Sequence, residues 1–401
     1  MRTIYVDKDI PRILLVSALR PVWPGAVLSS LAPARYAEVA DPPLPGPRWV
    51  RVKTTQCGIC ASDLALLTVD AAPSIGPSAL PGTERFYLGH ELVGEVREVG
   101  AGVTRVRLGD RVVMDAESGN CHSQEIDPPC PQCTRGNQML CENASAGRGP
   151  HGVGGGWSDN YTAHETSVAP VPPSLTDDQA TLVEPLSVGV RAALRRLPEA
   201  GQRALVLGSG TIGLCTLQAV RALSPDCHLT AVARYGHQAA LAGRFGADEV
   251  IDGKDLYGST ARITGARLYR GMMGSRMLLG GFDTVFDCVG SAHTLSSSLC
   301  CARAGGAVVL VGVKLRPLKV DLTPVWYQEV DLVGTFGHGT DTWQGRAVPD
   351  YDLVLDLLRQ GKLTADGFIT HRYPLSRWRE AVRTAMDKRS GAIKVVIDHR
   401  L

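Results

Sequence analysis

A glycine-rich hexapeptide near the middle of the chain limits the possible folds more than any other feature. Gly208-Ser209-Gly210-Thr211-Ile212-Gly213 follows an apolar, strand-like run over 204–207 and opens a helical pattern over 212–223. In that context Gly208 permits a tight turn, Gly210 lets the backbone approach a pyrophosphate, and Gly213 lets the helix pack closely on the sheet. The helix N-terminus adds free N–H groups for phosphates. The hexapeptide predicts a dinucleotide-binding unit; the alternative is a glycine-rich turn in an unrelated α/β protein.

The residues after the next strand bear on the choice between NAD and NADP. In such units an acidic residue about 20 positions beyond the glycines usually binds the ribose 2′-hydroxyl. Here the strand over 229–232 is followed by Ala233-Arg234-Tyr235. Ala233 leaves room for a 2′-phosphate, Arg234 can pair with it, and Tyr235 can flank the adenine. We therefore expect NADP to be favoured; a solvated Arg234 and use of NAD is the alternative.

Strand-like and helical patterns alternate on both sides of the hexapeptide. A helix is expected over 187–197 and another over 238–245, with strands over 284–288 and 308–311. Alternation of this kind predicts an α/β fold with a parallel, doubly wound sheet.

The flanking regions have a different texture. Residues 1–185 are rich in glycine, proline and short β-branched runs such as 49–54 and 92–99, which predicts antiparallel strands. A helix over 351–360 and a strand over 394–397 look more like this first region. We therefore expect a dinucleotide-binding domain over 187–336, inserted into a catalytic domain made of 1–186 and 337–401.

Composition excludes several classes of protein. The net charge of the 401-residue chain is +2, and its densest basic stretch, Arg262 to Arg276, is interleaved with apolar residues as in a solvated or packed face. The apolar run 13–18 is too short to span a bilayer. The 11 cysteines are spread over a large chain, unlike a secreted disulfide framework. We expect a cytoplasmic protein with no nucleic-acid and no membrane partner.

Three short motifs outside the dinucleotide unit carry metal-binding side chains. They are the stretch from Cys57 to Asp63, which includes Cys60, the stretch Gly89-His90-Glu91, and Glu184. Each is weak alone, because His90 could be a structural histidine and Glu184 a helix N-terminal carboxylate. Together they supply a thiolate, an imidazole and two carboxylates, a ligand set that suits zinc.

With these motifs the chain resembles the zinc-containing medium-chain dehydrogenases. Residues 89–103 fit the family signature GHE-x2-G-x5-G-x2-V, and Gly58 to Asp63 fit its GxCxxD motif, with Cys60 as the cysteine. Residues 253–280 match poorly. The resemblance implies a β-rich, GroES-like catalytic domain and a Rossmann domain. It implies a dimer or tetramer joined through the segment around 306–333.

The resemblance also assigns roles around a catalytic zinc. Cys60, His90 and Glu184 would be its ligands, and Glu91 a second carboxylate that can bind or leave the metal. Asp63 would orient His90, and Ser62 would receive the substrate proton. The family usually has a histidine where this chain has Ala65. Either the proton relay ends differently here, through the cofactor ribose and water, or another group takes the place of the histidine. Cys57 is expected to be a near neighbour rather than a ligand.

Further residues are assigned to the cofactor and to a second zinc. Val289, Val311 and Val313 would lie near the nicotinamide, and Lys394 of the terminal strand is also expected to contact the cofactor. The family's structural-zinc pattern is C-x2-C-x2-C-x7-C, and Cys130, Cys133 and Cys141 match its last three positions. Either Cys121 or Asp127 would complete that site. Free thiols without metal are the alternative.

The sequence therefore predicts an enzyme that transfers a hydride between a secondary alcohol, polyol or sugar and NAD(P). One alternative is a nucleotide-binding or sensing protein with a degenerate catalytic site. Another is a metal-free quinone or enoyl reductase of the same superfamily, whose members lack the thiolate, imidazole and carboxylate set found here.

Overall fold

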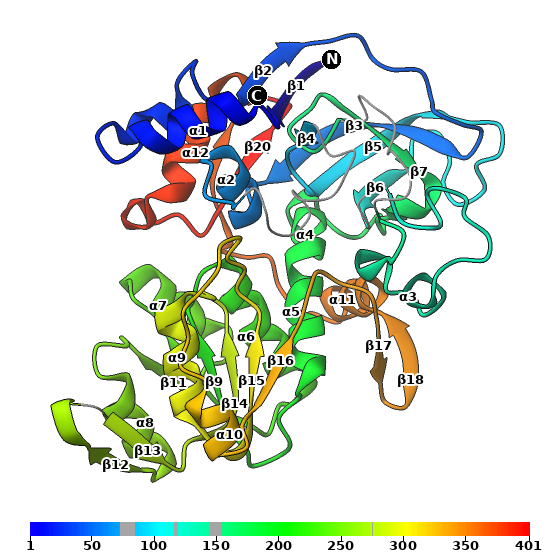
Figure 1. The fold of residues 1–401 in the computed structure, drawn as a ribbon. Coiled ribbons are helices and arrows are strands. Elements are labelled where there is room, and N and C mark those ends of the chain that lie inside the picture. The colour runs from blue at the N-terminus through cyan, green and yellow to red at the C-terminus, as the bar shows by residue number, and fades with distance from the viewer. Residues whose placement is uncertain (73–84, 116–118, 145–153, 275) are drawn as a thin grey trace. The chain divides into compact units, whose positions relative to one another are not determined.

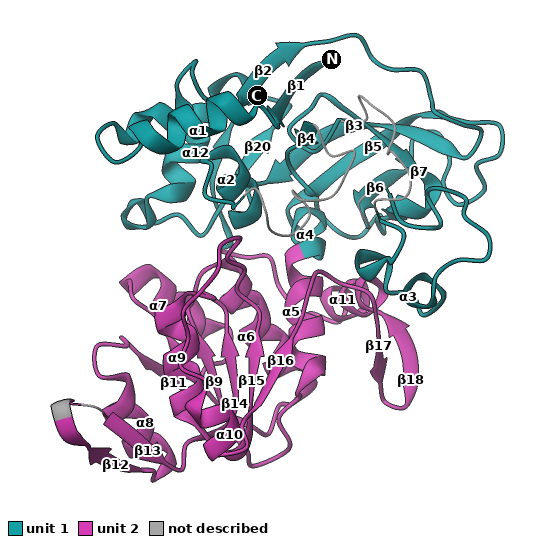
Figure 2. Cartoon of the chain, in the orientation of Figure 1, with its two compact units in different colours: residues 1–184, 368–401 teal, residues 185–367 magenta. Residues whose placement is uncertain are grey.

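The computed structural model of the protein describes residues 1–72, 85–115, 119–144, 154–274 and 276–401. The chain divides into two compact units, shown in different colours in Figure 2. Unit 1 comprises Met1–Glu184 and Phe368–Leu401, and unit 2 comprises Pro185–Gly367. Each unit is built around its own sheet. Among the described residues no helix is long and apolar enough to cross a bilayer.

Unit 1 is a β-rich unit with a seven-stranded sheet in the order β19-β20-β3-β5-β6-β8, in which β7 also pairs with β3. A three-stranded sheet, β2-β1-β4, accompanies it. The elements in chain order are β1 (Arg2–Asp7), α1 (Ile10–Leu19), β2 (Ala34–Glu38), β3 (Trp49–Gly58), α2 (Ala61–Leu67), β4 (Arg85–Tyr87), β5 (Glu91–Val99), β6 (Arg111–Met114), α3 (Pro131–Thr134), β7 (Asn160–His164), β8 (Val168–Pro170), α4 (Asp177–Thr181), β19 (Ile369–Tyr373), α12 (Trp378–Met386) and β20 (Lys394–Asp398).

The long strand β3 organises unit 1. It pairs antiparallel with β5 along most of its length, with β7 at its N-terminal half and with β20 at its C-terminal end. Val50 and Val52 of β3 are fully buried and share one apolar core with Leu92 and Val96 of β5. The predicted runs 49–54 and 92–99 are therefore strands, and β3 and β5 carry the two metal-binding motifs of this unit to the same end of the sheet.

Unit 2 is a parallel sheet in the order β11-β10-β9-β14-β15-β16, with helices packed against it (Figure 1). Its elements are α5 (Val183–Arg195), which begins in unit 1, β9 (Arg203–Leu207), α6 (Thr211–Leu223), β10 (His228–Val232), α7 (Gly236–Arg244), β11 (Glu249–Ile251), α8 (Leu256–Thr264), β12 (Arg267–Arg270), β13 (Arg276–Leu279), β14 (Phe282–Asp287), α9 (Ala292–Cys301), β15 (Ala302–Leu310), α10 (Thr323–Tyr327), β16 (Asp331–Gly334), β17 (Thr340–Trp343), β18 (Arg346–Pro349) and α11 (Asp350–Arg359).

The strand order of unit 2 reverses direction beside β9. From β9 the chain first builds outward through β10 and β11, and then returns to place β14, β15 and β16 on the other side. Ligands of doubly wound sheets bind at such a reversal, beyond the carboxyl ends of the strands. The glycine-rich hexapeptide directly follows β9, and the predicted doubly wound parallel sheet is confirmed.

The two units differ from the predicted domains mainly at the second boundary. The first change of unit falls at Glu184, close to the expected residue 186. Residues 337–367, including α11, lie in unit 2 and not with the first region. The reason is tertiary. The carboxyl group of Asp350 at the start of α11 lies 3.5 Å from the guanidinium of Arg191 in α5, and the Thr364 backbone exchanges hydrogen bonds with Gln218 of α6.

Candidate active site and metal centres

The first metal-binding group lies in unit 1, where α2 and β5 begin. One donor atom from each of Cys60, His90 and Glu91 lies within 4.8 Å of the other two. Cys60 is the N-cap of α2, and Glu91 is the first residue of β5. The backbone pairing of β3 with β5 places Gly58 opposite Glu91, which brings the two motifs together. Thiolate, imidazole and carboxylate are all donors that zinc accepts, so this group fits the metal.

Asp63 ties the two motifs to each other. Its carboxylate accepts a hydrogen bond of 3.1 Å from the Cys60 backbone N–H and one of 3.0 Å from the Gly89 backbone N–H. The same carboxylate lies 3.6 Å from Nδ1 of His90. Burial lowers the pKa of His90, but the charges of Asp63, Cys60 and Glu184 outweigh it, and the pKa is raised well above its usual value. Asp63 is therefore placed beside the His90 ring.

Glu91 is held by a buried lysine. Nζ of Lys394 lies 2.5 Å from both carboxylate oxygens of Glu91, and the two side chains are almost fully buried. Burial lowers the pKa of Lys394, but the charge of Glu91 leads the effects that raise it above its usual value. Lys394 was expected to contact the cofactor, and its contact with Glu91 was not anticipated. No local sequence pattern could predict the contact between Lys394 and Glu91, because the two residues lie 303 positions apart.

A glycine makes room for Glu91. A Cβ atom on Gly58 would lie 1.9 Å from Oε2 of Glu91, so any other residue at this position would displace the carboxylate. No local sequence pattern indicates this role for Gly58. The role depends on the register between β3 and β5.

Glu184 and Ser62 lie on the helices that flank this group. Glu184 is in the first turn of α5 and is not one of the three clustered donors. Burial raises the pKa of Glu184 to about 7, the charges of Glu91 and Asp63 add to the rise, and those of His90 and Lys394 oppose it. Glu184 therefore lies close enough to these residues for their charges to shift its pKa. Ser62 lies in the first turn of α2 and is partly exposed.

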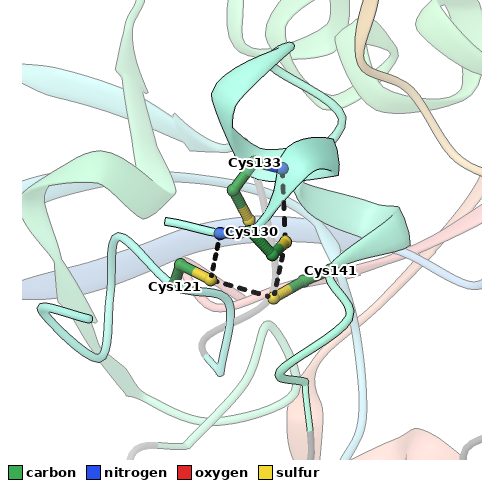
Figure 3. Close-up of side chains that lie close together, drawn as sticks. All are labelled: Cys121, Cys130, Cys133 and Cys141. Atoms are coloured by element: carbon green, nitrogen blue, oxygen red, sulfur yellow. Dashed lines mark hydrogen bonds between the residues drawn. The ribbon is translucent and has the colours of Figure 1, made fainter. Parts of the chain in front are cut away.

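The second metal-binding group is formed by four cysteines around α3. Sγ donors of Cys121, Cys130, Cys133 and Cys141 all lie within 4.8 Å of one another (Figure 3). Sγ of Cys141 is 3.6 Å from that of Cys121 and 4.0 Å from that of Cys130. Zinc–sulfur bonds of about 2.3 Å in a tetrahedron place sulfurs about 3.8 Å apart. The four thiols are spaced as zinc requires.

Several N–H groups point at these sulfurs. The backbone N–H of Cys130 and Nδ2 of Asn143 each donate to Sγ of Cys121 at 3.3 Å. The backbone N–H groups of Cys133 and Glu142 donate to Sγ of Cys130. The Cys133 N–H is the largest cause that lowers the pKa of Cys130, to about 6. Such donors favour thiolates, the form that binds zinc. The structure brings Cys121 into the group, whereas Asp127 is exposed outside it.

The glycine-rich turn of unit 2 has the predicted form. Gly208 adopts φ = 101°, a conformation that favours glycine, and a Cβ on Gly213 would lie 1.7 Å from the Gly208 carbonyl oxygen. A Cβ on Gly210 would meet nothing within 4 Å, and this residue is the N-cap of α6 without a side-chain cap. The open space beside uncapped N–H groups suits a phosphate. Oγ of Ser209 donates to the Val232 carbonyl at 2.9 Å and ties the turn to β10.

The residues expected near the ribose follow β10. Ala233 is buried, whereas Arg234 is exposed with its guanidinium 5.6 Å from the ring of Tyr235. The Tyr235 ring stacks on His237 with centroids 5.7 Å apart, a contact that the sequence analysis missed. No acidic side chain follows β10 directly.

The valines expected near the nicotinamide follow two strands of the sheet. Val289 comes after β14, and Val311 and Val313 come after β15. Val289 and Val313 are exposed, and Val311 is buried. The Val289-Gly290 turn packs on Gly312, because a Cβ on Gly290 would lie 2.1 Å from the Gly312 carbonyl oxygen. Asp287 holds this turn through hydrogen bonds from the N–H groups of Val289 and Gly290.

Comparison with known proteins shows similarity to dehydrogenases. Residues 46–173 match the family described as alcohol dehydrogenase GroES-like domain, and residues 211–351 match that described as zinc-binding dehydrogenase. The chain is 31% identical over 361 residues to the L-idonate 5-dehydrogenase of Vitis vinifera, covering 88% of each chain. It is 32% identical over 367 residues to a sorbitol dehydrogenase of Arabidopsis thaliana, covering 89% of this chain and 90% of the relative.

Solved structures of similar proteins share the fold. The 2R,3R-butanediol dehydrogenase of Bacillus subtilis superposes with a TM-score of 0.68 at 25% identity, covering 91% of this chain and 96% of the other. A protein of the zinc-binding dehydrogenase type from Sinorhizobium meliloti 1021, solved with bound NADP, gives a TM-score of 0.66 at 26% identity and covers 91% and 95%.

Proposed function

Because the chain belongs to the zinc-containing medium-chain dehydrogenase/reductase family, a family of nicotinamide-dependent oxidoreductases, we propose that it oxidises a secondary hydroxyl of a polyol or sugar. The observation that carries the proposal is the grouping of Cys60, His90 and Glu91 with Asp63 behind them. The polyol class is supported by relatives that act on idonate and sorbitol. A second carboxylate, Glu184, is the kind of ligand found in the polyol-dehydrogenase branch.

In this proposal Cys60, His90 and Glu184 hold the catalytic zinc, and Glu91 is the carboxylate that can exchange with them. When bound, zinc supplies Lewis acidity that lowers the proton affinity of the substrate hydroxyl. Asp63 fixes the His90 ring, and Lys394 fixes Glu91. Ser62 accepts the hydroxyl proton at Oγ and releases its own proton to solvent, to which its side chain is partly exposed. The nicotinamide cofactor, which the glycine-rich turn over 208–213 would hold, would supply the hydride acceptor, so that oxidation would yield a ketone, the reduced cofactor and a proton.

The test of this proposal separates the metal from the fold. We expect Cys60→Ala and His90→Ala to lose one zinc per chain and nearly all turnover with sorbitol-type substrates, while NADP binding to unit 2 persists. Cys227→Ala is the matched control, because this buried thiol belongs to unit 2, whereas both metal-binding groups belong to unit 1. Normal turnover in either zinc-ligand variant would overturn the mechanism.

The remaining assignments belong to the same proposal. NADP is preferred over NAD because Arg234 has no ion-pair partner among the described residues and Ala233 offers no competing carboxylate. Cys121 rather than Asp127 completes the structural zinc site. A cytoplasmic location agrees with cysteines that are all free thiols.

We also propose that the chain assembles as a dimer or tetramer through the segment around 306–333. Support comes from the edge strand β16 of the six-stranded sheet and from the exposed apolar side chains near it, Leu322, Trp326, Tyr327 and Leu332. An exposed edge strand next to apolar surface is suited to pairing with another copy. Light scattering of the purified protein at micromolar concentration measures the assembly directly, and a monomer would contradict it.

A further inference from the structure

The segment between α8 and β14 forms an exposed hairpin that the dehydrogenase chemistry does not use. Strands β12 and β13 pair antiparallel as a separate two-stranded sheet beside α8 (Figure 1). Leu268 and Leu278 lie opposite each other and pack into the apolar core of unit 2. One face of the hairpin is therefore anchored. The pleat turns the neighbouring residues to the other face.

The outward face of the hairpin is apolar and basic. Cross-strand pairing places Arg267 opposite Leu279 and Tyr269 opposite Met277. The side chains of Tyr269, Met277 and Leu279 are 47%, 36% and 44% exposed, and Met272 in the turn is 90% exposed. These four side chains form a small apolar group that is open to an apolar environment.

The charge of this segment has one sign. Residues 256–282 contain four arginines and no aspartate or glutamate. Arg262 forms an ion pair with Glu249, and Arg276 forms one of 3.2 Å with Asp255. Arg267 and Arg270 make no ion pair with any residue that the structure describes. The outward face therefore presents the cation of Arg267 among apolar side chains, and the exposed Arg270 at the end of β12 adds a second cation beside the turn. Two cations without ion-pair partners favour an anionic ligand.

The size of the face decides which anionic partner fits. Four residues on each of two strands cover a patch roughly 14 Å long and about 10 Å wide. A stable protein interface needs about 800 Å² from each partner, several times more than this patch offers. Pairing of two copies of the hairpin would bring like charges together. A lipid surface needs no complementary shape, and each side chain that reaches it contributes separately.

We infer that the β12–β13 hairpin, in its described residues 267–274 and 276–279, docks on anionic lipid bilayers. Met272 and Tyr269 enter the interfacial region, and Arg267 and Arg270 contact the anionic headgroups. This peripheral contact departs from the expectation of no membrane partner that the sequence raised. It is independent of the proposed enzymatic activity, because no residue of the hairpin belongs to either metal group or to the glycine-rich turn.

The experiment is co-sedimentation of the full-length, zinc-loaded protein with vesicles. We expect binding to vesicles of phosphatidylcholine with 30 mol% phosphatidylserine and at least about 25-fold weaker binding to phosphatidylcholine alone, since each arginine contributes about fivefold. Arg267→Glu/Arg270→Glu should abolish the preference. Arg346→Glu/Lys362→Glu is the control of equal charge change at two exposed positions elsewhere in unit 2, and it should retain most of the binding.

The contribution of the apolar side chains is tested with a second variant. Met272→Ser should weaken binding at both low and high salt, because it removes apolar contact rather than charge. Thermal melting of every variant excludes misfolding as the cause. If the control double variant loses as much vesicle binding as Arg267→Glu/Arg270→Glu, the binding depends only on the net charge of the protein. This result would overturn the assignment of the binding to the hairpin. Retention on poly-glutamate, lost in Arg267→Glu/Arg270→Glu, without retention on phosphatidylserine would reassign the face to an acidic polypeptide.

Discussion

The ammonium group of Lys394 sits 2.5 Å from both oxygens of the Glu91 carboxylate, and neither side chain reaches solvent appreciably. This pair joins the strand that begins at the GHE motif to a strand more than 300 residues later. It also decides where the second carboxylate of the candidate metal site points. Any account of Glu91 as an exchangeable ligand must include the lysine that competes for it.

The stability of unit 1 should depend on this pair. Removing one partner of a buried ion pair leaves an uncompensated charge and costs about 3–5 kcal/mol. We therefore expect Lys394→Met to lower the thermal midpoint of unit 1 by about 10 °C, measured by calorimetry. The double variant Lys394→Met/Glu91→Gln should recover much of the loss, because neither charge of the pair remains. A double variant as unstable as the single one would show that the lysine acts through packing alone.

The four-cysteine group should hold zinc independently of the first site. Cys130→Ser removes one of four sulfur donors, so elemental analysis should fall from two zinc ions per chain to one. Asp127→Ala should keep both, because Asp127 lies outside the cluster. Loss of zinc in the aspartate variant and its retention in Cys121→Ser would reverse the choice between these two residues.

Ser62 should affect turnover more than binding. Groups that transfer a proton in the transition state contribute about 10²–10⁴-fold to rate. We expect Ser62→Ala to lower kcat within that range with little change in zinc content or in NADP affinity. Ser62→Thr keeps the hydroxyl and should retain more activity. If Ser62→Ala turns over at the normal rate, another group or water accepts the proton.

Cofactor preference should follow Ala233 and Arg234. A charge-assisted hydrogen bond contributes about 1.5–3 kcal/mol, which corresponds to roughly a 10- to 150-fold preference for NADP in kcat/KM. Ala233→Asp should reverse the preference, because the new carboxylate accepts from a free ribose and repels a 2′-phosphate. Arg234→Gln should remove it without reversing it. A wild-type protein that clearly favours NAD would show that Arg234 does not reach the 2′ position.

Unit 2 contains a buried carboxylate whose ionisation opposes folding. Burial is the largest cause that raises the pKa of Asp350, to about 8; the neighbouring charge of Asp341 raises it further, and Arg191 opposes this. Because the folded state holds this proton more tightly than the unfolded chain, its contribution to stability is complete below about pH 4 and is lost as the pH rises toward 8. Asp350→Asn should remove that decline in the thermal midpoint, and an unchanged pH profile would contradict it.

Local pattern was enough to predict much of the fold. The glycine-rich hexapeptide, the strand before it and the helix after it are physical consequences of a few residues, and β9 and α6 lie where they were expected. The parallel sheet followed from alternation alone. The assignment of α11 to the wrong region has a simple cause. Its amphipathic pattern specifies a helix with one buried face, whereas the partner of that face, reached through Asp350 and Arg191, is set by tertiary contacts.

In the candidate sites, too, local sequence predicted some features, whereas others depend on tertiary contacts. The cysteine spacing predicted a metal lobe but left Cys121 and Asp127 as equals, since both lie near the required position in the chain. The lobe's loops, not its spacing, turn Cys121 inward. The roles of Gly58 and Lys394 could not be predicted, because they depend on strand register across long separations. A single sequence carries no direct trace of such pairings.

The place of β20 within the first sheet has a consequence for biosynthesis. This strand lies between β19 and β3 and supplies Lys394, yet the ribosome adds it only after the whole of unit 2 has been made. The β-rich unit, although translated first, cannot close its sheet during elongation. Unit 2 is contiguous and can fold as it emerges. The nascent chain must therefore carry an unfinished N-terminal sheet with an open β3 edge, and this is the stage at which chaperones would have most to protect.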